Sequence, residues 1–414
     1  MLRCHSPYVS ILLTLAFLTL GGCTLPRLPD SQDTAPVICP APAPCPACPV
    51  CAAAEPPKPV AKPLQPADWS DLPGWESENH ALVLELFRNS CTTLSKRPLW
   101  RASCEGMPKV DLGGTLSGST ARAWLESQLR PWALTNPDGG REGLVTGYYE
   151  PVIKGSREKK APYLTPVFGP PADLIVVELD SLYPELKNMR LRGRIEGRKL
   201  VPYYDRADWA GLEKQREDQA LLWVDNPIDF FFLQIQGSGQ VALADGSRVR
   251  IGYADQNGHP YRSIGKWLID KGELQSHEAS MQGIKAWAEK NPKRLQELLN
   301  TNPSMVFFRE LPVTGNGPPG ALGVPLTPER SIAVDPRHTP LGAPVWLVTT
   351  YPNSEQTLTR TMLAQDTGGA IRGPVRADFY WGTGIDAGNQ AGKMKQKGSM
   401  WALLPRSHDP GIAP

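Results

Sequence analysis

Residues 364–392 read AQDTGGAIRGPVRADFYWGTGIDAGNQAG. This stretch holds three acids, Asp366, Asp378 and Asp386, among seven glycines and few long polar side chains. Glycine-rich turns allow the backbone to come close to a ligand. Acids placed between such turns are costly unless they are solvated, paired or used in chemistry. The stretch therefore predicts a site for a ligand or a reaction.

Two of these acids, and a third upstream, lie at the edges of apolar runs. Asp335 follows SIAV, Asp366 follows MLAQ, and Asp378 precedes FYWGTG. An acid at the end of a strand often caps a turn by accepting bonds from backbone N–H groups. That interpretation is favoured for Asp335 and stays open for Asp366. Asp378 lies beside three aromatic residues, where partial desolvation raises the pKa of a carboxyl group, so we predict a functional role for it.

No standard metal, nucleophile or phosphate-binding motif accompanies these acids. The sequence lacks H-E-x-x-H, G-x-S-x-G and G-x-x-x-x-G-K, and its six histidines are scattered. Ser238 lies between two glycines, but it is embedded in FFLQIQGSGQVAL, where a glycine-flanked hairpin or a groove wall is the favoured interpretation. We therefore expect no metal and no cofactor.

The composition limits the class of protein. The 414 residues include 44 basic and 42 acidic side chains, so nothing favours binding to nucleic acid, which calls for a basic patch and a high pI. Frequent Pro (43) and Gly (38), together with 12 Trp, indicate a β- and loop-rich protein with aromatic surfaces. The length suits two domains, or one large domain with an insertion.

The N-terminal residues indicate the compartment. Arg3 precedes an apolar run at 9–20, which is followed by Gly-Gly and Cys23. This is the order of a signal peptide, and the run is short for a membrane span. Leu-Gly-Gly-Cys resembles the lipobox of bacterial lipoproteins, which implies removal of residues 1–22 and lipidation of Cys23; an ordinary signal peptide is the alternative. Thr24, where inner-membrane lipoproteins often have Asp, favours the outer membrane, with the protein facing the periplasm.

The other cysteines form two groups. Four of them, at 39, 45, 48 and 51, lie in a Pro/Ala run without a nearby His, so disulfides or idle thiols are favoured over zinc. Cys91 and Cys104 lie in ordered-looking sequence, and in an oxidising compartment we predict that they form a disulfide. Residues 23–66 are predicted to be the lipidated Cys and a polyproline-like linker, with folded sequence beginning near Trp69.

Hydrophobic periodicity predicts that helical and β-rich parts alternate. Short apolar runs from Leu144 to about residue 250, including DFFFLQIQGSGQVALADGSRVRIGYA, predict a β-rich unit with a hairpin at Asp245-Gly246, and β runs return after Asn302. The simplest account is an outer body interrupted by a β-rich insertion. Helices are expected at 76–94, at 120–129 after Ser119 or Thr120, at 261–271, at 280–289, and from Asn291 onward.

Several motifs resemble one enzyme family. VDPRHTPLG, DTGGAIRG and DFYWGTG resemble the "three aspartates" domain. GYYEP, FFLQIQGSG, GYADQNGHPYRSIG and NPSMVFFRE resemble the other blocks of the membrane-bound lytic murein transglycosylase A family. The resemblance spans about 69–404, with the motifs in the family's order.

This resemblance implies a fold that is mainly β with helices. A double-psi β-barrel, from residues 67–147 and 253–406, would be interrupted by a smaller β-barrel at 148–252, leaving a tail at 407–414. A groove between the two would hold a glycan strand of peptidoglycan. The implied reaction cleaves the β-1,4 bond between N-acetylmuramic acid and N-acetylglucosamine and leaves a 1,6-anhydro ring. The implied partners are peptidoglycan, the membrane through the N-terminal lipid, and proteins of wall-remodelling complexes.

The resemblance also assigns roles to residues. Asp378 matches the family's catalytic acid, Asp366 and Asp335 match acids that shape the site, and Asp386 is only a neighbour. Side-chain chemistry and family position together predict a sugar-binding set, for which the alternative is core aromatics and hairpin polar groups. Its members are Tyr148, Tyr149, Gln234, Gln236, Gly237, Ser238, Tyr253, Tyr261 and Gly368.

One acid is enough for this reaction because the 6-hydroxyl of the muramic acid is itself the nucleophile, whereas ordinary glycosidases use two carboxylates. Two other interpretations remain open. The first is a hydrolase in which Asp378 and Asp366 act as a pair around a water. The second is a non-catalytic murein-binding lipoprotein.

Overall fold

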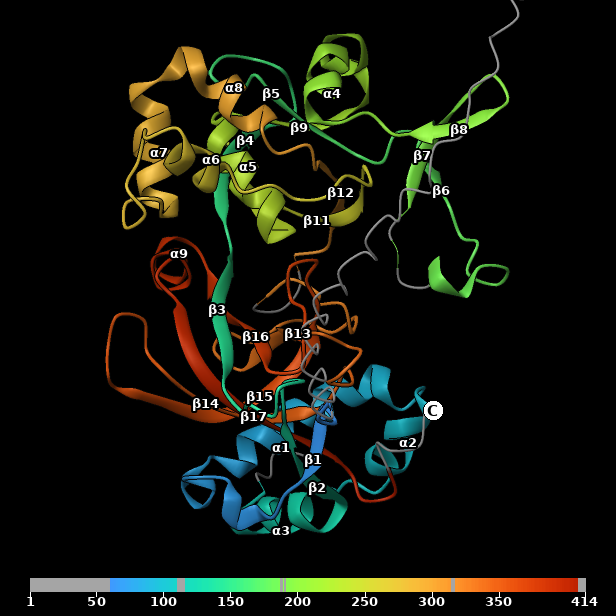
Figure 1. The fold of residues 1–414 in the computed structure, drawn as a ribbon, viewed down its shortest axis with the longest axis vertical. Helices are drawn as coiled ribbons and strands as arrows, with labels where there is room; N and C mark the ends of the chain where they lie inside the picture. Colours follow the sequence, from blue (N-terminus) through green and yellow to red (C-terminus); the bar gives the residue numbers. More distant parts are fainter. Residues whose placement is uncertain (1–59, 110–115, 187–188, 190, 314–316, 409–414) are drawn as a thin grey trace, which may run out of the picture. The chain divides into compact units, whose positions relative to one another are not determined.

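The computed structural model describes residues 60–109, 116–186, 189, 191–313 and 317–408. The predicted signal peptide, Cys23 and the four linker cysteines lie outside these residues. Within the described part of the chain, no helix is both long and apolar enough to cross a membrane. The structure combines β-sheets with α-helices, as predicted, in a mixed α/β arrangement (Figure 1).

Eight strands form the first sheet, in the order β1-β2-β17-β14-β15-β13-β16-β3. Because β17 also pairs with β3, six of these strands close into a ring. We call this the ring sheet. A large apolar core with Val145, Ile332 and Phe379 among its members also takes in residues of the N-terminal helical segment, such as Trp75 and Phe87. Its strands are β1 (Leu64–Pro66), β2 (Leu129–Leu134), β3 (Gly143–Glu150), β13 (Ser331–Val334), β14 (Pro344–Thr350), β15 (Thr357–Asp366), β16 (Arg376–Thr383) and β17 (Lys395–Pro405).

The second sheet has six strands in the order β12-β11-β10-β4-β9-β5, and we call it the inserted sheet. It is built from the sequence between β3 and β13, and its own apolar core includes Val167, Leu233 and Phe308. The strands are β4 (Val152–Ser156), β5 (Thr165–Phe168), β9 (Ala220–Val224), β10 (Ser238–Ala242), β11 (Arg248–Gln256) and β12 (Val306–Leu311). This sheet continues to Leu311, beyond residue 252, where we expected the insertion to end.

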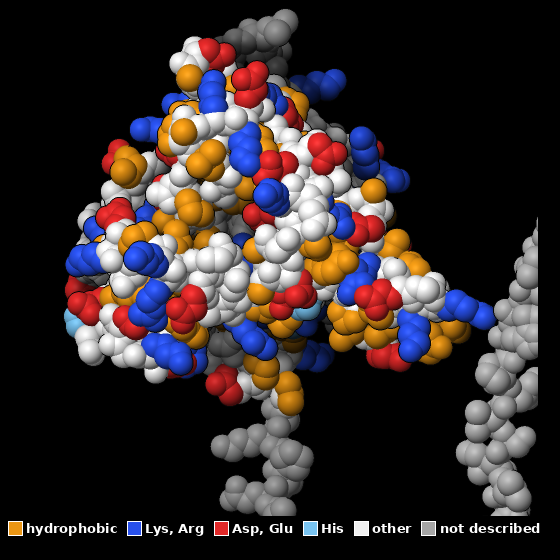
Figure 2. Space-filling model, turned by 90° about the horizontal axis from the view of Figure 1, so that it is seen from above, with side chains coloured by type: hydrophobic (Ala, Val, Ile, Leu, Met, Phe, Trp, Pro, Cys, Tyr) orange, Lys and Arg blue, Asp and Glu red, His pale blue; other side chains and the backbone are white. Residues whose placement is uncertain are grey.

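A small third sheet is formed by β6 (Ile175–Val176), β7 (Arg192–Glu196) and β8 (Lys199–Pro202). Its side chains are largely exposed, including Ile195 at 60 % and Leu200 at 48 %. Figure 2 shows apolar side chains, with both basic and acidic ones among them, on the lobe that this sheet forms.

Nine α-helices accompany the sheets in the described residues. Five of them are capped at the N-terminus by a Ser or Asn side chain that accepts a backbone N–H bond, from Asn79, Ser117, Asn226, Ser263 or Ser280. The helices are α1 (His80–Leu94), α2 (Pro98–Glu105), α3 (Gly118–Gln128), α4 (Arg206–Leu212), α5 (Pro227–Gln236), α6 (Ile264–Asp270), α7 (Met281–Lys290), α8 (Leu295–Asn300) and α9 (Ile385–Ala391).

The largest difference from the sequence-based expectation is α5, because we assigned its residues to a β run. Pro227 occupies the first turn, and the Asn226 side chain accepts a bond from the Ile228 amide. Gly237 then ends the helix with φ +79°, in the left-handed region. Its run of phenylalanines is buried on more than one side, and a helix apolar all round lacks the periodicity that distinguishes it from a buried strand.

Smaller differences concern boundaries. Ser117, not Ser119 or Thr120, caps α3, and β1 lies inside the predicted linker. Helix α1 begins at His80, four residues later than expected, because a short 3-10 turn occupies 75–77. The hairpin at Asp245-Gly246 is confirmed, with Gly246 at φ +83° between β10 and β11.

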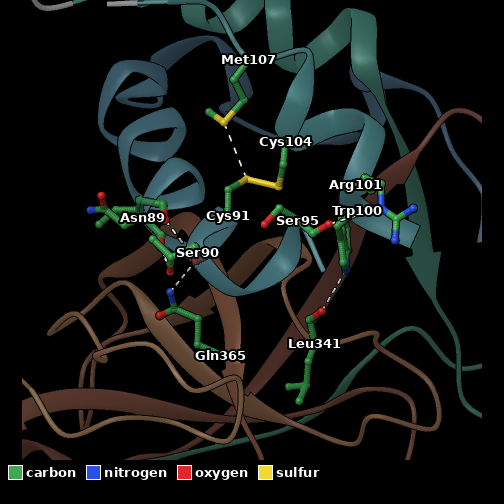
Figure 3. Close-up of a disulfide and its surroundings, with 12 residues drawn as sticks. Asn89, Ser90, Cys91, Ser95, Trp100, Arg101, Cys104, Met107, Leu341 and Gln365 are labelled. Atoms are coloured by element: carbon green, nitrogen blue, oxygen red, sulfur yellow. Dashed lines mark hydrogen bonds between the residues drawn. A yellow bond between two sulfur atoms is a disulfide. The ribbon is translucent and has the colours of Figure 1, made fainter. Parts of the chain in front are cut away.

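The disulfide between Cys91 and Cys104 joins α1 to α2 (Figure 3). The Met107 sulfur lies 3.7 Å from that of Cys91. Nearby, the amide of Gln365 donates to Ser90 of α1 at 2.9 Å, so the last turns of α1 are attached to β15 directly before Asp366. The helical N-terminal segment therefore braces one of the acid-bearing strands.

Candidate active site

Two of the three predicted acids are brought together by strand register. Ala333 on β13 is the register partner of Asp366 on β15 and of Asp378 on β16. On the other side of Asp378, its register partner on β3 is Thr146. Alternate residues of a strand point to opposite faces, so the neighbours of Asp378, Ala377 and Phe379, belong to the large apolar core while the acid does not.

Asp378 is held by a short, ordered set of contacts. Thr146 Oγ1 donates to its Oδ1 at 2.6 Å, and Arg376 Nη2 in turn donates to Thr146 Oγ1 at 2.9 Å. Because the threonine oxygen accepts from the arginine, its own proton is directed to the carboxyl group. In the described part of the chain, hydrogen bonds to this side chain reach Oδ1 and leave Oδ2 for another partner.

The electrostatic setting of Asp378 suits a proton donor. Burial raises the pKa of Asp378 to about 6, against the lowering effects of the Thr146 hydrogen bond and the Arg376 charge, while the neighbouring Asp366 raises it further. Asp378 is half-buried, so part of its surface is accessible to solvent. A carboxyl group with this pKa can hold a proton near neutral pH and still be reached by a ligand.

Asp366 has a more crowded environment. Its Oδ1 accepts from the amides of Ala321 at 3.0 Å and Thr367 at 2.9 Å, and its Oδ2 accepts from the Tyr148 hydroxyl at 3.0 Å. Burial raises the pKa of Asp366, although these three donors oppose the shift. Both oxygens are therefore engaged in fixing a loop and a tyrosine.

Asp335 is buried and pairs with its own loop. Arg337 approaches both carboxyl oxygens, with Nε 2.9 Å from Oδ1 and Nη2 2.5 Å from Oδ2, and the Gly373 amide donates to Oδ2 at 2.9 Å. Burial alone would raise the pKa of Asp335, but these bonds outweigh it and hold the pKa well below its ordinary range. The expected turn-capping role therefore describes this residue, which fixes the loop ending at Gly373.

An apolar cluster of Tyr148, Leu326, Ala333, Ile371 and Tyr380 surrounds the acids. The rings of Tyr148 and Tyr380 lie 5.2 Å apart between centroids. Burial, with the nearby Asp366 and Asp378, raises the pKa of Tyr148 well above its ordinary value, so its hydroxyl keeps its proton. We call the surface formed by Asp366, Asp378 and this cluster the acid face.

Sequence reasoning missed Glu150, at the end of β3. It is fully buried, and its Oε1 accepts from Arg250 Nε at 2.7 Å, while its Oε2 accepts from Gln240 and Thr383, each at 2.8 Å. A charged residue directly after the apolar strand GLVTGYY was the available signal, but its partner Arg250 lies 100 residues away.

Comparison with known proteins decides the family. Residues 144–309 match the model of the MltA specific insert domain, and residues 330–404 match the 3D domain. The membrane-bound lytic murein transglycosylase A of Escherichia coli K12 is 33 % identical over 295 residues, covering 69 % of this chain and 72 % of that protein. The chain belongs to the membrane-bound lytic murein transglycosylase A family. It is therefore homologous to an enzyme.

Solved structures of this family support the same assignment. The crystal structure of MltA from Neisseria gonorrhoeae matches with a TM-score of 0.72 and 36 % identity, covering 86 % of this chain and 95 % of that one. The structure of E. coli MltA with bound chitohexaose matches with a TM-score of 0.59 and 27 % identity, covering 84 % of this chain and 93 % of that one. The acid face thus lies in the fold of the transglycosylase A family.

The predicted sugar-binding residues of this family member fall into distinct environments. Tyr149 is buried with its hydroxyl 3.5 Å from the Met281 sulfur, and its amide donates to Gln236 Oε1 at 3.1 Å. Gln234 is buried in the inserted part, where its Nε2 donates to the Val306 carbonyl at 3.4 Å. Gln236 is therefore attached to β3, whereas Gln234 faces a protein interior.

The remaining predicted positions are more accessible. Gly237 and Ser238 are half-buried at the junction of α5 and β10, and Gly368 is half-buried in the loop after Asp366. Tyr253 and Tyr261 are exposed by 37 % and 52 %. Asp386 is exposed in the first turn of α9, where a carboxylate is favourable near the helix N-terminus. Among the described residues, no cluster of three or more His, Cys, Asp or Glu side chains is arranged to hold a metal ion.

Proposed function

We propose that this protein is a lytic transglycosylase that cleaves the β-1,4 bond between N-acetylmuramic acid and N-acetylglucosamine in peptidoglycan and leaves 1,6-anhydromuramoyl ends. The carrying observation is Asp378: a half-buried carboxyl group on the acid face, with a raised pKa and Oδ2 available to a ligand. Family membership supports the reaction class, and the chitohexaose bound to the E. coli relative supports a glycan as the ligand.

In the proposed mechanism, protonated Asp378 gives its proton to the glycosidic oxygen as the bond to C1 of the muramic acid breaks. The 6-hydroxyl oxygen of the same sugar forms the new bond to C1. The proton of that hydroxyl passes to the Asp378 carboxylate, which restores the acid, so no water is consumed. The nucleophile is already tethered to the reacting carbon, which gives the reaction its proximity advantage.

The contacts of Asp366 support a single-acid mechanism over a two-carboxylate hydrolase. A second carboxylate that activates water needs a free oxygen facing the substrate. Both oxygens of Asp366 instead accept bonds, from Ala321, Thr367 and Tyr148. We assign it the role of holding Tyr148 and the loop after β15, and we assign Asp335 the role of fixing the same loop at Gly373.

The closed strand order of the ring sheet supports the proposal that it is the double-psi β-barrel implied by the resemblance. The inserted sheet would be the smaller barrel, with the glycan lying between the two. Gln236, Gly237, Ser238, Tyr253, Tyr261 and Gly368 remain the proposed sugar-binding positions. Gln234, Tyr148 and Tyr149 would contribute indirectly, because their side chains are buried.

We also propose that the protein is a lipoprotein of the outer membrane, lipidated at Cys23 and facing the periplasm, with residues 24–66 acting mainly as a spacer. The names of the relatives describe them as membrane-bound, and a lipid anchor would satisfy that description for this chain. Labelling with a fatty acid should mark the full-length protein and should fail for Cys23→Ser.

The product mass tests the proposed reaction. Purified protein digesting purified peptidoglycan should give muropeptides lighter by one water, about 18 mass units, than reducing-end products. Asp378→Asn should retain binding to glycan strands and lose turnover. Reducing ends alone would contradict the transglycosylase proposal, and equal turnover of the variant and the wild type would contradict the role of Asp378.

A further inference from the structure

Glu150 occupies the point where the chain leaves the ring sheet for the inserted sheet. Strand β3 ends at Glu150, and β4 begins at Val152. The carboxylate accepts bonds from both sheets: Arg250 and Gln240 belong to the inserted sheet, and Thr383 belongs to the ring sheet. We call Glu150, Gln240, Arg250 and Thr383 the junction cluster. It links the two sheets through side chains at the place where the backbone also crosses.

On the ring-sheet side, the junction cluster continues to the acid face. Thr383 lies at the end of β16, the strand that carries Asp378, and its hydroxyl is 3.4 Å from that of Tyr380. Tyr380 packs on Tyr148, whose hydroxyl bonds Asp366. In addition, the Gly384 amide donates to the Glu150 carbonyl at 2.9 Å. A displacement of Glu150 would therefore also displace the end of β16, the strand that carries the proposed catalytic acid.

On the other side, the cluster continues to the proposed sugar-binding turn. Gln240 lies on β10, which begins at Ser238. The backbone N–H of Gln240 donates to the Pro151 carbonyl at 2.8 Å. Gln236, at the end of α5, accepts from the Tyr149 amide. Adding a Cβ to Gly239 would place it 2.3 Å from Leu233 and 3.1 Å from the Pro151 carbonyl, so this turn is tightly packed against the crossing.

A role in stability alone is a weak explanation for this arrangement. Arg250 is 1 % exposed and Glu150 is 0 % exposed, so both charges are desolvated. Replacing a buried ion pair with apolar side chains of similar size is often neutral or stabilising. The distinctive property of the junction cluster is its geometry. The Glu150 carboxylate accepts four hydrogen bonds from residues on β10, β11 and β16, and these bonds constrain the position of β16 relative to β10 and β11.

We propose that Glu150 is a positioning residue that, through Thr383 on one side and Gln240 and Arg250 on the other, fixes the Gln236–Ser238 turn relative to Asp378. This inference rests on the proposed glycan-cleaving function. Removing hydrogen bonds from the junction cluster should therefore make productive binding of the glycan less favourable, while the pKa of Asp378 stays the same.

Thr383→Val gives the most selective test, because it removes the ring-sheet hydroxyl and leaves Glu150 paired with Arg250. We expect a normal melting temperature and a value of kcat/KM for soluble uncrosslinked glycan strands that is lower by about tenfold, since a small misplacement of a bound substrate is costly. The pH dependence of kcat/KM should be unchanged. Thr383→Ser, which keeps the hydroxyl, should restore the rate.

A double variant, E150M/R250M, tests the ion pair. It leaves Gln240 bonded to Arg248, which lies 3.1 Å from its Oε1. We expect a folded protein, a higher KM and a lower kcat/KM. The matched control is E78M/R330M, because Glu78 and Arg330 also form an ion pair, at 3.0 Å, with side chains 3 % and 15 % exposed, and this pair does not join the two sheets. This control should leave KM unchanged.

The outcomes separate the two proposals. If wild-type protein forms no anhydro product, the proposed function fails. If the wild type is active and both Thr383→Val and E150M/R250M keep its kcat/KM, the positioning role of Glu150 is overturned. A loss of kcat/KM in Thr383→Val that Thr383→Ser shares would also overturn it. So would a loss in E150M/R250M that E78M/R330M reproduces.

Discussion

Thr146 donates a 2.6 Å hydrogen bond to Asp378 Oδ1, and the two residues are register partners on parallel strands β3 and β16. The bond stabilises the ionised carboxylate and therefore lowers the pKa of Asp378 against the larger, opposite effect of burial. It also fixes which oxygen faces outward. A residue of β3 thus tunes an acid that lies 232 positions later in the chain.

Removing this donor should change the pH profile in a defined direction. In Thr146→Val the pKa of Asp378 rises, so the acid stays protonated to higher pH. The alkaline limb of the kcat/KM profile therefore shifts to higher pH. We expect the maximal rate to fall by about tenfold, because the carboxyl group loses its orientation. Thr146→Ser should resemble the wild type. An unchanged alkaline limb in Thr146→Val would show that this limb does not report Asp378.

Replacing the acid itself should stabilise the fold at neutral pH. Burial raises the folded-state pKa of Asp378 to about 6, above that of the unfolded chain, so the stability present in acid is lost as pH rises through 6. Asp378→Asn cannot ionise and avoids this loss. We expect its free energy of unfolding at pH 7.5 to exceed that of the wild type by about 1–3 kcal/mol. Urea denaturation should show the gap closing below pH 4.

Asp335 should behave in the opposite way. Its pKa is held below the ordinary range, so the ionised form contributes stability above pH 4 that is lost as pH falls toward the folded-state pKa. Asp335→Asn weakens the bonds to Arg337 and Gly373 and should cost about 2–3 kcal/mol at pH 7. The difference from the wild type should shrink in acid. Equal stability of the two proteins at pH 7 would contradict the structural role given to Asp335.

The disulfide should support the fold without taking part in the chemistry. Cys91 and Cys104 are 13 positions apart, and a crosslink closing a loop of about that size contributes about 3 kcal/mol. The C91A/C104A variant should therefore melt at a lower temperature in the absence of reductant. Its kcat at 20 °C should match that of the wild type, since the groups that bond Asp366 and Asp378 in the described residues lie on elements other than α1 and α2. A large loss of kcat in folded C91A/C104A would show that these helices shape the acid face.

Local sequence was enough to select candidate residues but not to predict which residues would lie next to them in the fold. Asp378 was identifiable because aromatic and glycine residues flank it. Its closeness to Asp366 was not, because both acids meet across Ala333 through strand register, which local sequence does not specify. The turn-capping interpretation of Asp335 was available because an acid before Pro commonly has that role.

The errors and omissions have similar physical causes. Helix α5 was taken for a β run because it is apolar around its circumference and offers no periodic contrast. Glu150 was overlooked because its importance depends on Arg250 and Thr383, which lie 100 and 233 positions away. The helix expected at 280–289, in contrast, is present as α7 and is capped by Ser280, since a helix boundary depends largely on residues within one turn.

Digestion in water enriched in oxygen-18 tests the central claim most directly. In the proposed reaction the 6-hydroxyl of the muramic acid attacks C1 and no water enters the product. Muropeptides released by the wild-type protein should therefore have anhydro ends and carry no label, while Asp378→Asn should release none. Labelled reducing ends from the wild type would show that water is the nucleophile and would contradict the proposed mechanism.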